Sequence, residues 1–67
     1  MNSALAAPGK SIRTLRLLAG LTLEQTAEEA DVSSTYLSRV ETGKVRATPK
    51  WLGHVAGVIA DHLGRTA

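Results

Sequence analysis

Two short helical patterns, separated by a short break, occupy residues 21–44 of this 67-residue chain. The first, 23–30, has a narrow apolar face of alanines. The second, 33–42, places Leu37 and Val40 three residues apart, so both side chains can point to one side of a helix. Two helices this short bury little apolar surface between themselves. They are therefore predicted to form a helix-turn-helix, a motif that holds its second helix outward.

Capping residues mark the ends of both helices. Thr22 and Gln25 have the spacing of a capping box, in which each side chain bonds the backbone amide of the other residue. Asp31 tolerates the left-handed conformation of a tight turn better than most residues. Ser33 can cap the second helix, and Gly43 can end it.

Two longer helical patterns flank this pair. The pattern before it begins at Ser11, which can cap a helix, and ends at Gly20, which suits a left-handed turn. Its apolar positions are Ile12, Leu15, Leu18 and Ala19. The pattern after it starts at Thr48-Pro49, because threonine caps a helix and proline fits the first helical position, and it ends at Gly64. Its apolar positions are Trp51, Leu52, Val55, Ala56, Ile59 and Leu63.

The length of the chain suits one small domain with a compact core. Pro8-Gly9 is predicted to break any helix, so residues 1–10 are expected to be a flexible arm. The folded domain is then 11–64, and 65–67 form a tail. The expected fold is all-α.

Composition excludes several classes of protein. The chain has no cysteine, so a disulfide frame or a thiolate metal site is excluded, and an intracellular setting is expected. No apolar run approaches the roughly 18 residues of a membrane span, and residues 1–8 lack the features of a signal peptide. A soluble cytoplasmic protein without membrane contact is predicted.

Charges are segregated along the chain, although the net charge is only +2. An acidic block consists of Glu24, Glu28, Glu29 and Asp31, and the basic residues before and after it are Lys10, Arg13, Arg16, Arg39, Lys44, Arg46 and Lys50. This asymmetry is typical of a small DNA-binding domain with one phosphate-facing side. From charge alone, an ordinary solvated surface explains it equally well.

Several short segments, taken together and in order, resemble the phage repressor and Cro type of helix-turn-helix proteins, which includes many small bacterial transcriptional regulators. The segments are Ile12-Arg13-Thr14-Leu15-Arg16, Gly20-Leu21-Thr22, Ala27, Val32-Ser33, Tyr36-Leu37-Ser38-Arg39-Val40-Glu41, Gly43-Lys44 and Pro49. The resemblance covers about residues 12–59. It implies a compact repressor-like domain of four or five helices that binds double-stranded operator DNA, with helix 33–42 as the recognition helix.

The resemblance also implies which residues contact DNA. The residues expected to contact bases are Ser33, Ser34, Thr35 and Arg39. The residues proposed to contact phosphates are Thr22, Tyr36, Ser38, Lys44, Arg46 and Lys50. Arg39 is the strongest candidate, because a guanidinium can bond both O6 and N7 of guanine. Its alternative is a solvated residue paired with an acidic neighbour, and Tyr36 could instead cover the edge of the core.

Four further positions follow from the resemblance. Arg16 and Glu41 match an arginine and a glutamate that form a largely buried ion pair, so their role is expected to be structural. Leu23 stands where many family members carry a phosphate-contacting glutamine, and Thr26 replaces a usual core leucine.

A homodimer on DNA is one expected assembly. The last part of the final helix, with Val58, Ile59 and Leu63, is predicted to stay exposed in a monomer and to form the dimer contact. The competing interpretation is an antitoxin-like or antirepressor-like module that uses the same fold to bind a protein. The polar outer side of helix 33–42 favours DNA over that interpretation.

An enzyme is not expected. His54 and His62 are eight residues apart, which is not the spacing with which one helical turn binds a metal, and no catalytic set surrounds them. No metal, cofactor or small-molecule ligand is predicted.

Overall fold

The computed structural model describes residues 8–66 and has four helices and no strand in that range. The helices are α2 (Pro8–Leu18), α3 (Leu23–Ala30), α4 (Ser34–Glu41) and α5 (Pro49–Thr66). The predicted all-α, four-helix fold is therefore confirmed. None of these helices is long and apolar enough to span a bilayer.

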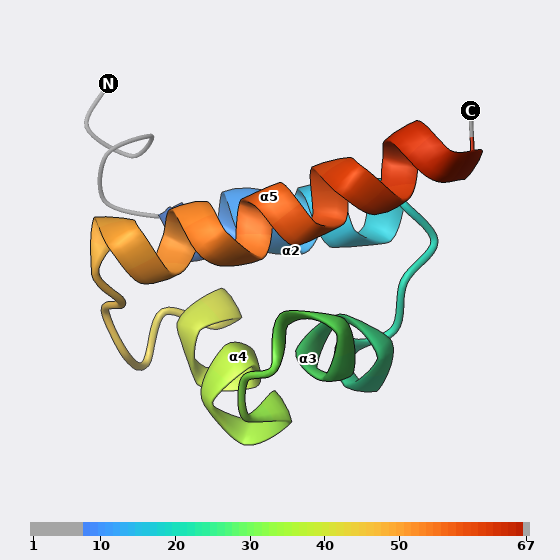
Figure 1. The fold of residues 1–67 in the computed structure, drawn as a ribbon. Coiled ribbons are helices and arrows are strands. Elements are labelled where there is room, and N and C mark those ends of the chain that lie inside the picture. The colour runs from blue at the N-terminus through green and yellow to red at the C-terminus, as the bar shows by residue number, and fades with distance from the viewer. Residues whose placement is uncertain (1–7, 67) are drawn as a thin grey trace.

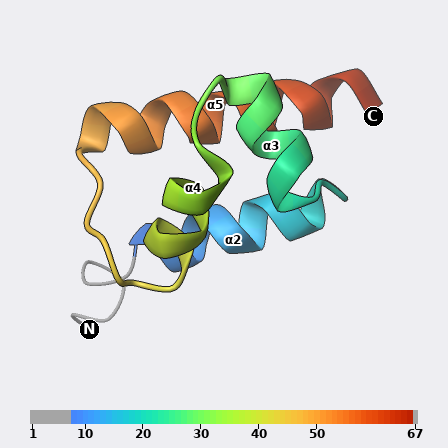
Figure 2. The same ribbon diagram turned by 90° about the horizontal axis from the view of Figure 1, so that it is seen from below.

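The helices form two layers. The long helices α2 and α5 run side by side, and the short helices α3 and α4 lie across them (Figures 1 and 2). Helix α4 packs against α2 and α3, while α3 also packs against α5. One side of α4 is thus held by the rest of the fold, and its opposite side faces outward.

The core lies between the two layers. It consists of Ile12, Leu21, Ala27, Ala30, Leu37, Val55 and Ile59. Ile59 is completely buried, so its predicted role as an exposed dimer contact is wrong. The prediction failed because α3 covers this part of α5, a contact between segments that are distant in the sequence.

The predicted caps of α3, α4 and α5 are present, whereas Ser11, the predicted cap of the first helix, lies inside α2. The Thr22–Gln25 capping box begins α3, Ser33 Oγ accepts the amide of Tyr36 at 3.1 Å, and Thr48 Oγ1 accepts the amide of Trp51 at 3.1 Å. Asp31 has the predicted left-handed backbone conformation, with φ of 57°. Local sequence thus fixes the boundaries of the two short helices.

The start of α2 differs from its prediction. Pro8 and Gly9 begin the helix instead of breaking it, because the first helical position needs no amide donor. The predicted arm is therefore wrong for residues 8–10, and its remaining part, 1–7, lies outside the described residues. At the other end, α5 continues past Gly64 to Thr66, so Arg65 is helical and does not begin a tail.

The inward face of α2 does not coincide with its apolar pattern. Leu15 and Leu18 belong to the apolar pattern of this helix, but their exposed fractions are 37% and 72%. The buried positions are Gly9, Ile12 and Arg16, which fall on one face at spacings of three and four residues. Close packing at Gly9 and the burial of Arg16 decide which face of α2 points inward.

Candidate nucleic-acid interface

A concave surface lies between the start of α3 and the outer side of α4. Its lining residues are Leu23, Glu24, Ser34, Thr35, Ser38, Arg39, Thr42 and Lys44, and we call it the α3–α4 groove. The groove brings together five residues that the sequence assigned to DNA contact, namely Ser34, Thr35, Ser38, Arg39 and Lys44. Glu24 and Thr42 were not assigned. Thr42 could have been found from its position one helical turn after Ser38.

The inward packing of α4 determines which of its side chains line the groove. Leu37 and Val40 are 0% and 2% exposed and fix the inner face of the helix. Thr35 and Arg39 therefore lie on the solvent side, where both are exposed. The outer face of α4 consists of hydroxyl groups and one guanidinium, which can bond the polar edges of bases.

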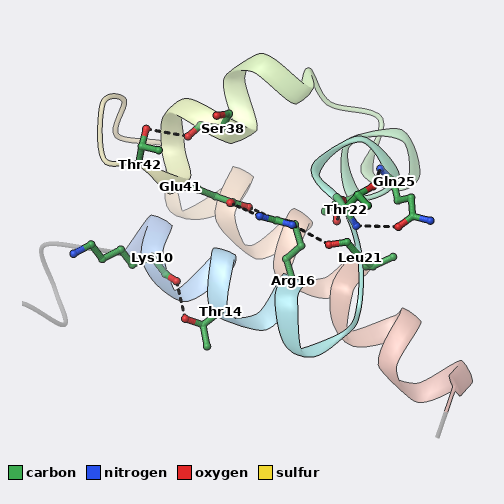
Figure 3. Close-up of polar contacts among 10 residues, drawn as sticks. Lys10, Thr14, Arg16, Leu21, Thr22, Gln25, Ser38, Glu41 and Thr42 are labelled. Atoms are coloured by element: carbon green, nitrogen blue, oxygen red, sulfur yellow. Dashed lines mark hydrogen bonds and ion pairs between the residues drawn. The ribbon is translucent and has the colours of Figure 1, made fainter.

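The segment directly after α4 also lines the groove, through Thr42 and Lys44. The Thr42 hydroxyl can donate to the carbonyl of Ser38, at 3.0 Å (Figure 3). Gly43 then takes a left-handed conformation with φ of 82°, and the amide of Lys44 donates to the carbonyl of Arg39 at 2.8 Å. These bonds hold the backbone of Lys44 at the end of the groove.

The capping box at the start of α3 uses the backbone amide of Thr22. This amide donates to Oε1 of Gln25 at 2.9 Å, while the Gln25 amide donates to Oγ1 of Thr22 at 3.0 Å (Figure 3). The Thr22 amide is thus already engaged and is not available for the predicted phosphate contact of this residue. The Thr22 hydroxyl keeps its own hydrogen and can still donate.

Arg16 and Glu41 form the expected ion pair between α2 and the end of α4 (Figure 3). Nε and Nη2 of Arg16 donate to the two carboxylate oxygens of Glu41 at 2.8 and 2.9 Å, and Nη1 donates to the carbonyl of Leu21 at 2.9 Å. Both side chains are buried. The hydrogen bonds to Glu41 raise the pKa of Arg16 despite its burial, so the guanidinium is charged.

The exposed cations of the interface are not neutralised in the same way. Within residues 8–66, the ion pairs are Arg16–Glu41 and those that Glu29 makes with Arg65 and His62. Arg39 thus lacks the acidic partner that its alternative interpretation requires. Its guanidinium and the Lys44 ammonium lie in the same groove.

The remaining predicted contacts lie outside the groove. Arg46 and Lys50 are exposed on the segment after Lys44, and Arg46 lines a different cleft together with Lys10. Ser33 and Thr22 cap the two helices. Tyr36 is half-buried, and its ring meets the Trp51 ring edge to face, with centroids 5.1 Å apart. This packing is the core-covering role left open for Tyr36.

The two histidines join α5 to α3. Nε2 of His54 lies 2.7 Å from the carbonyl oxygen of Ala30, and Nδ1 of His62 lies 3.7 Å from Glu29. In the part of the chain that the structure describes, no group of three or more acidic, histidine or cysteine side chains is arranged to hold a metal ion.

Comparison with known proteins agrees with this geometry. A family model described as a helix-turn-helix domain matches residues 9–67. Searches among curated proteins and among solved structures gave no significant match. The match covers most of the chain, including all of α3 and α4. The chain therefore belongs to a helix-turn-helix family of DNA-binding domains.

Proposed function

We propose that this protein is a sequence-specific transcriptional regulator of the phage repressor and Cro type, which occupies an operator in double-stranded DNA and represses transcription in the cytoplasm. The observation that carries the proposal is the α3–α4 groove. Its α4 side presents hydroxyl groups and an unpaired guanidinium, while the buried Arg16–Glu41 pair anchors the same helix from behind.

In this proposal α4 enters the major groove, as recognition helices of this motif do. Arg39 bonds O6 and N7 of a guanine, a contact that is worth about 1–3 kcal/mol of discrimination. Ser34 and Thr35, at the start of the helix, contact neighbouring bases, with Ser33 at the edge of the groove. The short hydroxyl side chains make few base contacts, so much of the affinity comes from the DNA backbone.

The proposed phosphate contacts lie around the base-contacting residues of α4. Lys44 at the end of the groove contacts one backbone strand, and Arg46 and Lys50 extend the contact along the following segment. Thr22, at the start of α3, binds through its hydroxyl because its amide is engaged by Gln25. Ser38 completes the set, together with the hydroxyl group of Tyr36, whose ring packs on Trp51. These groups supply affinity without distinguishing sequences.

The test is selection of bound duplexes from a randomised pool, followed by binding of the selected duplex and a scrambled duplex of the same composition. The proposal expects tighter binding of the selected sequence at every salt concentration. Equal binding of both duplexes would contradict sequence specificity, and loss of all duplex binding would contradict the DNA-binding role.

A dimer on DNA is the second part of this proposal. A symmetric dimer would place its two α4 helices in successive major grooves, about 34 Å apart. With Ile59 buried, its candidate contact is reduced to the half-buried Val58 and Leu63 of α5. Sedimentation equilibrium with and without the selected duplex tests it, and a palindromic selected sequence would support it.

An interaction with another protein remains the second candidate function. Leu17 and Leu18 of α2 are 53% and 72% exposed, which gives that helix an apolar surface away from the α3–α4 groove. A module that binds protein through α2 would tolerate Arg39→Ala but lose its partner with Leu18→Gln. A repressor would instead lose duplex binding with Arg39→Ala and keep it with Leu18→Gln.

A further inference from the structure

A carboxylate lies in the α3–α4 groove beside the residues proposed to bind DNA. Glu24 is exposed at the second position of α3 and lines the same surface as Arg39 and Lys44. Every other charged residue of that lining is basic. A phosphate strand passing the start of α3 therefore meets one negative charge among the positive ones.

No cation in direct contact neutralises Glu24. The ion pairs of residues 8–66 do not include it. The Arg16 guanidinium, which attracts the charge of Glu24 without forming an ion pair with it, is held by both oxygens of Glu41 and is buried with that residue. The negative charge of Glu24 therefore remains effective at the surface of the groove.

We propose that Glu24 limits the affinity of this protein for DNA by repelling phosphates at the start of α3. The inference rests on the proposed function and concerns regulation of the same surface. Weak binding to arbitrary sequences matters, because non-specific sites in a genome vastly outnumber specific ones and compete for the protein. Because the repulsion is electrostatic, it weakens as salt screens the charges.

The test compares three variants that each remove one negative charge. Glu24→Gln changes the groove, Glu28→Gln changes the same helix one turn further on, and Asp61→Asn changes an exposed site on α5. Neither Glu28 nor Asp61 lines the groove. Binding of a fluorescently labelled mixed-sequence duplex is measured by anisotropy between about 50 and 200 mM salt, the range over which phosphate contacts respond strongly.

We expect Glu24→Gln to bind the mixed-sequence duplex about 3–10-fold more tightly than the wild type at low salt, since an electrostatic contact of this kind is worth about 1 kcal/mol. The two controls should change affinity less than twofold, and the gain should shrink as salt rises. Melting temperatures of all variants show whether folding is unchanged.

Two outcomes separate this inference from the proposed function. Equal gains for all three variants, or no gain for Glu24→Gln, would overturn the role of Glu24 while leaving duplex binding intact. A wild-type protein that binds no duplex would overturn both proposals.

Discussion

Gly9 of α2 lies directly against the backbone of Val40 in α4. A Cβ atom at position 9 would overlap the Val40 carbonyl oxygen and lie 2.8 Å from the carbonyl carbon. Neither atom can rotate away, because both belong to a helix backbone. The close approach of α2 and α4, which sets the position of the proposed recognition helix, therefore requires glycine at position 9.

Gly9→Ala should destabilise the protein by at least about 1–3 kcal/mol, the cost that is typical of overpacking. This cost is a large fraction of the stability of so small a domain. Urea unfolding followed by circular dichroism measures the loss. Gly57→Ala is the matched control, since a Cβ atom there meets nothing within 4 Å. This control should be neutral or stabilising by about 0.5–1 kcal/mol, because alanine favours helix. Equal stabilities of the two variants would contradict the close approach.

Removing one member of the buried ion pair should be strongly destabilising. Arg16→Ala leaves the Glu41 carboxylate buried without its partner, and we expect a loss of about 3–5 kcal/mol. Thermal melting reports it. Replacing both residues, as in Arg16→Met with Glu41→Leu, should recover much of the loss, because no charge is then left unpaired. An Arg16→Ala protein that melts at the wild-type temperature would rule out the structural role.

Asp31 combines a left-handed conformation with a negative charge at the C-terminal end of α3. Asp31→Asn keeps a side chain that tolerates this conformation and removes the unfavourable interaction with the helix dipole. We expect it to stabilise the protein by about 0.3–1 kcal/mol at low ionic strength, and less at high salt. Asp31→Ala should be less stable than Asp31→Asn, because alanine adopts the left-handed region less readily. Urea denaturation at two salt concentrations distinguishes these contributions.

Leu18 and Ile12 provide a direct test of the orientation of α2. Leu18→Gln should change the free energy of unfolding by no more than about 0.5 kcal/mol, because the side chain is largely exposed. Ile12→Ala should cost about 2–5 kcal/mol, because Ile12 is 4% exposed in the core. If Leu18→Gln proved as damaging as Ile12→Ala, α2 would have to be rotated about its axis relative to the structure.

Arg39 and Lys44 should have different effects on DNA binding although they line the same groove. Arg39→Ala is expected to reduce the difference in binding free energy between a selected and a scrambled duplex by about 1–3 kcal/mol, because it removes a base contact. Lys44→Ala should weaken both duplexes alike and reduce the slope of log affinity against log salt by about one unit. The measurement is a salt titration of both duplexes with each variant. Identical behaviour of the two variants would refute the division into base and phosphate contacts.

Local signals in the sequence predicted much of the proposed interface. The Thr22–Gln25 box, the left-handed Asp31 and the Ser33 cap place α3 and α4 correctly, because capping depends on residues three or four positions apart. Once α4 is a helix, burial of Leu37 and Val40 turns Thr35 and Arg39 outward. The same locality explains why Glu24 was not assigned, since its place in the groove depends on how α3 sits beside α4.

By itself, the sequence determined where α3 and α4 lie along the chain and which side of α4 is polar. The tertiary structure decided which face of α2 points inward, that Pro8 and Gly9 belong to the helix, and that Ile59 is covered. Hydrophobic periodicity could not reveal which face of α2 is buried. Two of the residues on that face, Gly9 and the paired Arg16, contribute nothing to an apolar pattern. That face is set by the close approach of α2 to Val40 and by the position of Glu41, both on a helix more than twenty residues away.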